Sequence, residues 1–242
     1  MSLTPEDEEI AAYWSHASTA RGRFAIRLRL AFKRVAWRGV VGGSAVLKRL
    51  VDIFGSAAAL VALSPVFFVV TLLIKREDGG VIFFGQQRVG YRGRLFRMWK
   101  FRSMVPNADA LKEKLLAENE MQGGVIFKMK NDPRITRIGR FIRKYSIDEL
   151  PQFWNVFRGE MSLVGPRPPI PKEVAEYDVE SRQRLMAKPG LTCFWQVGGR
   201  SNIDFAGQVR LDLAYIRSES IWLDISLLLK TVPAVLLGQG AY

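Results

Sequence analysis

The feature that most limits the fold of this chain is an uncharged run of 22 residues, 53–74, with a proline near its middle. A helix needs about 20 apolar residues to cross the hydrocarbon core of a bilayer, so the run is long enough to enter a membrane. Pro65 lacks a backbone N–H and clashes with the preceding helical turn, and the neighbouring Ser64 can stabilise a bend. The sequence therefore predicts two short helices joined at a break.

Positive charge lies at both ends of this run. Lys48 and Arg49 precede it, and Lys75 and Arg76 follow it. Lys and Arg favour the cytoplasmic side of a membrane, so both ends are best placed there. Each arm then has about ten residues, which at about 1.5 Å per residue suffices for one leaflet. We therefore expect a re-entrant membrane helix; a kinked spanning helix and a buried core helix are the alternatives.

Composition narrows the classes of protein that remain. With 36 Lys+Arg against 23 Asp+Glu, the 242 residues carry a formal charge of +13, while 48% of them are hydrophobic. A disordered basic tail would lack the hydrophobic residues, and a polytopic transporter would need more long apolar segments. A single cysteine, Cys193, excludes intramolecular disulfides and fits a reducing compartment, and a single histidine, His16, argues against histidine catalysis. Such a basic protein meets nucleic acid or an anionic membrane surface.

The N-terminal part divides into an acidic and a basic segment. Residues 1–20 contain four acidic side chains and no Lys or Arg, which predicts a solvated tail without the basic start of a signal peptide. Residues 20–49 carry nine Lys and Arg and no acid, interleaved with aromatic and aliphatic side chains. This pattern is typical of a helix lying in a membrane interface, with a solvated basic helix and a nucleic-acid arm as alternatives.

The remaining sequence predicts a small globular domain of the α+β class that is mainly helical. Residues 81–84 and 95–99 are expected to form a β-hairpin around the turn 90–93. Residues 107–120 resemble a charged amphipathic helix that ends at two glycines. Further helical segments follow, and residues 214–237, centred on Trp222, predict an amphipathic surface helix.

We accordingly expect three parts along the chain. They are a polar tail with a basic amphipathic helix over residues 1–47, a re-entrant membrane helix over 48–76, and a cytoplasmic catalytic domain with C-terminal surface helices over 77–242.

Residues 131–168 are best suited to chemistry. Seven basic side chains surround the adjacent acids Asp148 and Glu149: Arg134, Arg137, Arg140, Arg143, Lys144, Arg158 and Arg167. Arginines in this setting can pair with the carboxylates, or bind the phosphates of a substrate that a carboxylate attacks. The structural alternative is a helix cap, because Ser146 and Glu149 have the spacing of a capping box. The N-terminus of such a helix would also attract phosphate.

Two further basic sites lie nearby. Lys100 and Arg102 directly follow a predicted strand, although such a pair is usually a solvated face. Three prolines surround Arg167, which predicts a stiff loop that presents the guanidinium; a rigid structural turn is the alternative. The spacing of Gly90 and Gly93 meets neither nucleotide-binding fingerprint.

Many ordered motifs from Lys48 to the C-terminus together resemble one family. They are Lys48-Arg49-x-x-Asp52, Ser64-Pro65, Gln87-Arg88-Val89-Gly90, Lys100-Phe101-Arg102-Ser103-Met104, Asp132-Pro133-Arg134-x-Thr136, Arg143-x-x-Ser146-x-Asp148-Glu149-Leu150-Pro151-Gln152, Met161-Ser162-Leu163-Val164-Gly165-Pro166-Arg167-Pro168, Pro189-Gly190-Leu191-Thr192 and Trp195-Gln196-Val197. The chain resembles the bacterial sugar transferases that act on polyprenyl phosphate, the small monotopic phosphoglycosyl transferases. It departs from them at Cys193, where relatives commonly have Gly.

This resemblance implies an enzyme that transfers a hexose-1-phosphate from a UDP-sugar to undecaprenyl phosphate and releases UMP, with Mg²⁺ as cofactor. The family's Asp-Glu pair falls on Asp148 and Glu149. Asp148 would be the nucleophile that forms a covalent aspartyl-phosphosugar in a ping-pong sequence, and a metal ligand. Glu149 would orient the site or move a proton. The substrate- and phosphate-binding residues that the resemblance implies are Lys100, Arg102, Arg143, Pro166, Arg167 and Pro168.

The expected location is the cytoplasmic face of a bacterial inner membrane, with anionic lipid as a partner and no nucleic acid. The enzyme would begin exopolysaccharide, capsule or O-antigen synthesis. Glucose and galactose are favoured as the sugar by overall likeness, and a homodimer through the globular face is a further expectation. A catalytically silent scaffold of a polysaccharide assembly machine is the alternative function, and the intact Asp148–Glu149 pair argues against it. Charge alone would also suggest a nucleic-acid-binding protein. The uncharged run 53–74 argues against this class, because a nucleic-acid-binding domain has no need of it.

Overall fold

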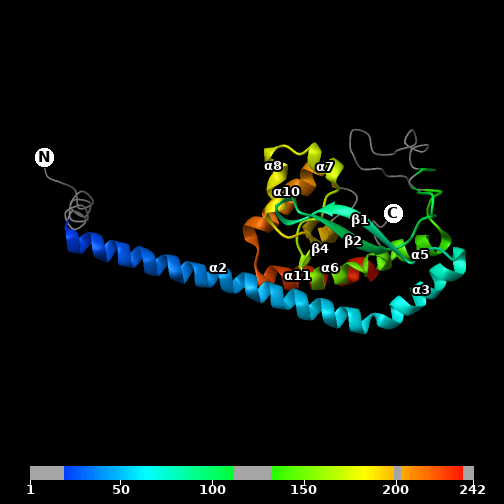
Figure 1. The fold of residues 1–242 in the computed structure, drawn as a ribbon, viewed down its shortest axis with the longest axis horizontal. Helices are drawn as coiled ribbons and strands as arrows, with labels where there is room; N and C mark the ends of the chain where they lie inside the picture. The colour runs from blue at the N-terminus through cyan, green and yellow to red at the C-terminus, as the bar shows by residue number, and fades with distance from the viewer. Residues whose placement is uncertain (1–18, 109, 112–131, 199–202, 237–242) are drawn as a thin grey trace. The chain divides into compact units, whose positions relative to one another are not determined.

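Figure 1 shows the chain in a computed structural model that describes residues 19–108, 110–111, 132–198 and 203–236. The chain divides into two compact units, Met1–Lys48 and Arg49–Tyr242. The predicted acidic tail and most of the helix predicted over residues 107–120, with its glycine stop, lie outside the described residues. The described residues form a mainly helical fold with two small sheets, which agrees with the predicted class.

Helix α2 (Ala20–Ala62) begins in the first unit and continues into the second. The basic segment predicted to be helical is therefore a helix from Ala20 onward. Phe24 and Leu28, one helical turn apart, are both exposed in it. The position of this helix at a membrane interface stays a prediction.

The predicted break in the uncharged run is confirmed. Helix α3 (Ser64–Asp78) follows α2 at an angle of 57°. Pro65 lies in the first turn of α3, where its missing N–H has no intrahelical partner to lose. The Ser64 hydroxyl donates a hydrogen bond of 2.8 Å to the carbonyl of Val61, which the end of α2 would otherwise leave free. Helix α3 ends at Gly79, which has a φ of 68°.

The two helices meet the requirement for a membrane span only as a pair. Across the part of the chain that the structure describes, no single helix is long and apolar enough to cross a bilayer, whereas Gly43–Ala62 and Ser64–Asp78 together are. Val70 and Ile74 of α3 are buried against Phe101 and Ile142, while most other large side chains of α3 are exposed. The helix is therefore attached along one face and open along the other.

Two polar residues of α2 anchor it to the rest of the second unit. Arg49 donates hydrogen bonds of 2.7 Å to the carbonyls of Val156 and Phe157, at the end of helix α6 (Gln152–Arg158). Asp52, which is 3% exposed, accepts bonds of 2.9 Å from the Ser162 hydroxyl and the Leu163 amide. Because a buried carboxylate is costly without partners, these bonds fix where the helix attaches.

The predicted hairpin is confirmed, with different strand ends. Strands β1 (Phe83–Val89) and β2 (Leu95–Phe101) pair antiparallel around the turn η1 (Tyr91–Gly93), where Arg92 and Gly93 have φ values of 54° and 79°. Strand β1 starts two residues later than predicted and runs five residues further, through a glycine and polar side chains that conceal a strand signal. A Cβ atom at Gly85 would lie 2.5 Å from the Arg97 side chain, so a larger residue there would have to displace that side chain.

A second sheet was not predicted. Strands β3 (Ser162–Val164) and β4 (Gly190–Thr192) pair in parallel. Three residues are too few to show an alternating pattern. The glycines beside them explain two sequence motifs, because a Cβ atom on Gly190 would lie 2.0 Å from the Gly165 amide nitrogen and one on Gly165 would lie 2.3 Å from the Lys188 carbonyl oxygen.

Short helices complete the described part of the second unit. They are α5 (Arg137–Lys144), η3 (Ile147–Glu149), α7 (Pro171–Ala175), α8 (Val179–Arg182), η4 (Gln183–Met186), α9 (Phe194–Gly198), α10 (Phe205–Ser218) and α11 (Ile221–Leu236). The single helix predicted over residues 214–237 is wrong, because α10 ends at Ser218 and α11 starts at Ile221. The Ser220 hydroxyl accepts a bond from the Leu223 amide and begins a new helix there.

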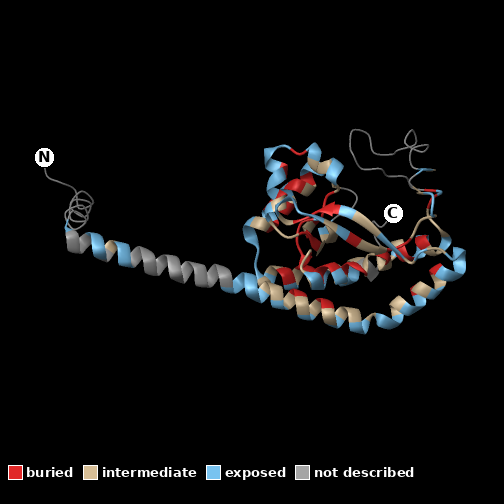
Figure 2. Ribbon diagram, in the orientation of Figure 1, coloured by how far each residue is buried: buried red, intermediate tan, exposed pale blue. Residues whose placement is uncertain are grey.

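Two hydrophobic clusters hold these elements together. The larger contains Met98, Val156, Met161, Leu163, Val164, Tyr215 and Leu227. It joins the hairpin to α6, the β3–β4 sheet and the two C-terminal helices, and Figure 2 shows buried residues concentrated among these elements. The smaller cluster joins α3, β2 and α5. Residues from distant parts of the sequence are thereby fixed around one end of β2.

Candidate active site

Asp148 and Glu149 lie on a single 3₁₀ turn, η3, between α5 and α6. Ser146 precedes the turn with a φ of 53°, a left-handed conformation that costs a residue other than glycine about 1–3 kcal/mol. The structural alternative of a capping box is wrong, because the Ser146 side chain makes no cap hydrogen bond. The Glu149 carboxylate is instead engaged by Lys100 of β2.

Lys100 connects the two acids. Its Nζ lies 2.6 Å from Glu149 Oε1 and 3.8 Å from Asp148 Oδ2. These side chains are partly enclosed, so their mutual attraction is stronger than between solvated charges. A strand residue thus brings a cation against two carboxylates that lie 48 and 49 positions later in the sequence.

The two carboxyl groups differ in their affinity for protons. Burial raises the pKa of Asp148 to about 6, against the opposing charges of Lys100 and Arg143 and with the help of the neighbouring Glu149 charge. Burial would also raise the pKa of Glu149, but Lys100, Arg167 and Arg88 outweigh it and keep that pKa below its ordinary value. Glu149 is therefore ionised at neutral pH, whereas Asp148 ionises at a pH of about 6. Neighbouring acids with separated pKa values are typical of catalytic pairs.

An open pocket lies against this turn. It is lined by Arg88, Met98, Lys100, Glu149, Gln152, Arg167, Pro168, Gly190, Leu191 and Gln196. The three cations among them face one carboxylate. An excess of positive charge in a recess of this kind suits a substrate that carries more than one phosphate.

The loop that carries Arg167 is held from two sides. The Val89 amide donates to the Pro169 carbonyl at 2.9 Å, and the Gly190 amide donates to the Pro166 carbonyl at the same distance. Pro166 and Pro168 are buried while Arg167 is exposed, with its Cζ 5.7 Å from the centre of the Trp195 ring. The geometry matches the stiff loop expected from the sequence.

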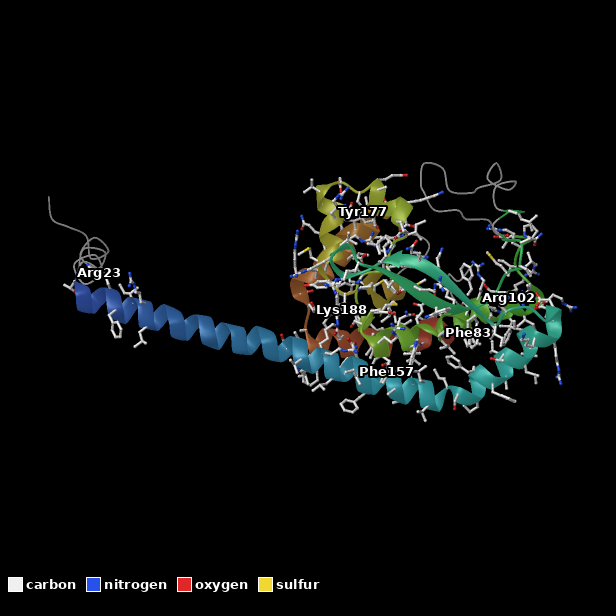
Figure 3. All side chains as sticks on the ribbon, viewed as in Figure 1. Arg23, Phe83, Arg102, Phe157, Tyr177 and Lys188 are labelled. Carbon is white, nitrogen blue, oxygen red and sulfur yellow. The ribbon has the colours of Figure 1, made fainter. Side chains whose placement is uncertain are left out.

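The other implied binding residues take different positions. Arg102, which Figure 3 labels, does not line the pocket. It pairs with Asp78 at the end of α3, with one hydrogen bond of 2.7 Å. Arg143 lies in the last turn of α5 and acts on Asp148 through its charge. Pro166 lines a smaller neighbouring pocket that shares Arg167 with the first.

The site residues predicted from the sequence did not include six residues that line the pocket, namely Arg88, Met98, Gln152, Gly190, Leu191 and Gln196. Arg88 is 6% exposed and donates to the Pro168 carbonyl at 2.8 Å. Burial and the nearby Arg167 lower its pKa to about 10. Its only sequence signal was its place in a motif, since nothing local shows that β1 ends beside the Arg167 loop.

Cys193, the departure noted above, acts on the pocket indirectly. Its thiol is buried and donates to Gln196 Oε1 at 3.2 Å. Burial raises the pKa of this thiol, so it stays protonated and unreactive. Its contribution is to restrain the amide of a residue that lines the pocket.

Comparison with known proteins identifies the family of this chain. The model of the family described as bacterial sugar transferase matches residues 43–238, and the chain belongs to that family. The galactosyl transferase CpsE of Streptococcus agalactiae serotype III (strain NEM316) is 50% identical over 197 residues, which are 81% of this chain and 43% of that protein. The undecaprenyl-phosphate galactose phosphotransferase of Salmonella typhimurium is 46% identical over 202 residues, which are 82% of this chain and 42% of that protein.

A shorter relative matches over most of its length. The exopolysaccharide production protein ExoY of Sinorhizobium fredii is 40% identical over 205 residues, which are 84% of this chain and 90% of that protein. The chain spans about two fifths of the length of the two galactose-named relatives. The resemblance inferred from the ordered motifs is confirmed at the level of the family.

Proposed function

We propose that this chain transfers a hexose-1-phosphate from a UDP-sugar to undecaprenyl phosphate, as a first membrane step of exopolysaccharide, capsule or O-antigen synthesis. The observation that carries the proposal is the Asp148–Glu149 pair, whose pKa values are separated, beside a pocket lined by three cations. The names of the relatives support it, because one is an undecaprenyl-phosphate galactose phosphotransferase and another an exopolysaccharide production protein. A charge-paired and strained acidic turn has no use in a silent scaffold.

In the first half-reaction, an ionised Asp148 attacks the β-phosphorus of the UDP-sugar. A bond forms between a carboxylate oxygen and phosphorus, and the bond from that phosphorus to the bridging oxygen breaks, so that UMP leaves with the electron pair. In the second half-reaction, a phosphate oxygen of undecaprenyl phosphate attacks the same phosphorus and restores the Asp148 carboxylate. The covalent aspartyl-phosphosugar separates two reactants that need not bind together.

The pocket cations reduce the repulsion between the carboxylate and the diphosphate. Two like charges 4 Å apart repel by about 4 kcal/mol at an effective dielectric constant of about 20. Arg88, Lys100 and Arg167 line the pocket in which the diphosphate would lie. Lys100 contacts both acids and keeps Glu149 ionised, which leaves Glu149 able to orient a ligand or accept a proton.

Asp148 and Glu149 fit a Mg²⁺ ion that the substrate helps to bind. The described residues contain no group of three His, Cys, Asp or Glu side chains that could hold a metal by themselves. Mg²⁺ is usually held by one or two carboxylates together with substrate phosphates and water, which Asp148 and Glu149 can supply with the donor. When bound, the ion would neutralise charge on the diphosphate as UMP leaves.

We place the enzyme at the cytoplasmic face of the inner membrane, with α2 and α3 as a re-entrant pair. Large apolar side chains are exposed on four helices of the second unit: Leu50, Phe54, Val61, Phe68, Val69, Leu72, Trp154, Phe157, Trp222, Ile225, Leu229 and Val232. On α11 they recur every three or four residues, and Trp222 is 82% exposed. Monomeric soluble proteins rarely expose so much apolar surface, and anionic lipid would meet the flanking lysines and arginines.

The test is an assay of UMP release from a panel of UDP-sugars with undecaprenyl phosphate in detergent. We expect turnover with UDP-glucose or UDP-galactose, and one equivalent of UMP per enzyme when undecaprenyl phosphate is omitted. No release from any UDP-sugar would contradict the transferase proposal. If UMP is released only when undecaprenyl phosphate is present, the covalent intermediate is contradicted but the transferase proposal is not.

A further inference from the structure

A buried charged network lies behind the Arg167 loop, and the proposed chemistry does not use it. Asp212 of α10 is 1% exposed, and its Oδ2 accepts from Arg184 Nε at 2.8 Å and from Arg184 Nη2 at 2.6 Å. Arg184 also donates from Nη1 to the Tyr177 hydroxyl at 2.9 Å (Figure 3 labels Tyr177). Its Cζ lies 5.7 Å from the Tyr177 ring centre and 5.8 Å from that of Phe205. Arg184 is thus fixed from several sides and holds Asp212 in place.

Two polar atoms in this region lack partners although they are complementary. Asp212 Oδ1, an acceptor, and Trp195 Nε1, a donor, are both buried without a hydrogen-bond partner among the described residues. Helix α9, which carries Trp195, packs against α10, which carries Asp212. The Trp195 indole also lowers the pKa of Asp212, which burial raises to about 6. The N–H and the carboxylate oxygen therefore face each other, and a small approach satisfies both.

The face of the same indole supports a residue of the pocket. Arg167 Cζ lies 5.7 Å from the Trp195 ring centre, within the range of a cation–π interaction. No acidic side chain of the described residues forms a salt bridge with Arg167, so the ring is the contact that orients its exposed guanidinium. A carboxylate that accepts the indole N–H makes the ring face more negative and strengthens its attraction for the guanidinium.

We propose that Asp212 and Trp195 are positioning residues for Arg167. Asp212 holds the indole through its N–H, and the indole face holds the guanidinium over the pocket, where it binds the diphosphate of the donor. Arg184 neutralises Asp212 and keeps the network in one arrangement. The proposal rests on the proposed function only in taking the ligand to be a uridine diphosphate compound.

The test is a double-mutant cycle between Trp195 and Arg167. Trp195→Phe keeps an aromatic ring and removes the N–H, so it should fold. We expect it to weaken UDP binding, measured by calorimetry, and to raise the KM for the UDP-sugar by about three- to tenfold, which is the range of a cation–π contact. The KM for undecaprenyl phosphate should stay unchanged. In an Arg167→Ala background, Trp195→Phe should cause no further loss.

Two further variants support the cycle. Asp212→Asn removes the charge but keeps the shape, and it should show the same selective loss of UDP binding at a pH of about 8, where Asp212 is ionised. Trp99→Phe is the matched control, because the Trp99 ring lies 5.6 Å from Arg97 and does not line the pocket. This variant should bind UDP like the wild type.

The outcomes separate this proposal from the proposed function. Additive losses in the cycle, or UDP binding that Trp195→Phe leaves unchanged, would overturn the positioning role. If Trp195→Phe weakens UDP binding only when Arg167 is present, but no variant releases UMP from UDP-sugars, the positioning role is supported and the transferase proposal is contradicted. A wild-type protein that does not bind UDP would overturn both.

Discussion

At the residue scale, Lys100 and the burial of η3 give two adjacent acids different properties. Glu149 is held by Lys100 at 2.6 Å, whereas Asp148 lies 3.8 Å from the same ammonium and is more deeply buried. The Glu149 carboxyl, which is nearer to Lys100, keeps its charge. The pKa of Asp148 is raised toward neutral pH. This asymmetry favours Asp148 as the group that can give up its charge to a covalent bond.

Asp148→Asn should lower UMP release by at least about a thousandfold, because an amide oxygen is a poor nucleophile. The measurement is UMP release with the best UDP-sugar. Asp178→Asn is the control, since Asp178 is an exposed helix cap for which Asn is equally suitable. Undiminished turnover in Asp148→Asn would remove Asp148 as the nucleophile.

The same substitution should stabilise the fold at neutral pH when divalent metal is chelated. The pKa of Asp148 is raised from 3.8 to about 6 on folding, so the folded state binds more protons than the unfolded state between these values. Its contribution to the free energy of unfolding is therefore favourable at about pH 4 and is lost as pH rises, by about 3 kcal/mol at 1.36 kcal/mol per pKa unit. Asp148→Asn should match the wild type near pH 4 and exceed it above pH 7 in denaturation experiments. A difference that does not change with pH would contradict the raised pKa.

At the element scale, the close approach of Gly165 and Gly190 fixes the Arg167 loop. The strands β3 and β4 meet backbone to backbone at these glycines, and the Gly190 amide bonds to the Pro166 carbonyl. The loop therefore depends on Gly165 and Gly190, because a side chain at either position would clash with the backbone of the other strand or its neighbour.

Gly190→Ala should lower the free energy of unfolding by about 1–3 kcal/mol, as overpacking does, and should weaken UDP binding because the loop must move. Thermal unfolding and calorimetry are the measurements. Gly198→Ala is the matched control, since an added Cβ there meets nothing within 4 Å and alanine suits a helix. Equal stability of the two variants would show that the β3–β4 contact yields easily.

Pro65→Ala should favour one continuous helix across the α2–α3 break, because the amide N–H and the steric space for helical bonding are restored. The accessibility of Lys48→Cys and Lys75→Cys to a membrane-impermeant reagent reports the side on which each flank lies. Both flanks should be cytoplasmic in the parent, and one should change sides in the Pro65→Ala background. If both stay cytoplasmic in that background, Pro65 does not set the topology.

At the scale of the whole molecule, the second unit contains the matched family region almost completely, and the pocket lies wholly within it. Removal of residues 1–43 should therefore weaken association with anionic vesicles without abolishing UMP release. Vesicle flotation and the UMP assay measure the two properties separately. An unchanged bound fraction would refute the interfacial role of the basic helix, and loss of turnover in a folded protein would show that this segment serves the site.

Part of this structure could be predicted because its causes are local in the sequence. The break at Pro65 follows from a missing N–H, and the hairpin follows from two apolar segments around a glycine turn. Motif and composition also selected Glu149 and Arg167, which the structure places at one pocket. In contrast, the helix predicted over residues 214–237 failed where one serine hydroxyl begins a new helix.

What the sequence by itself determined is the break at Pro65, the β1–β2 hairpin and the family of the chain. Tertiary structure alone decided the partners: Lys100 for Glu149, Asp78 for Arg102, and the place of Arg88 in the pocket. It also decided the pairing of two three-residue strands 28 positions apart. The physical reason is that backbone conformation depends on neighbouring residues, whereas pKa values and ion pairs depend on burial and on charges that only the folded chain brings together.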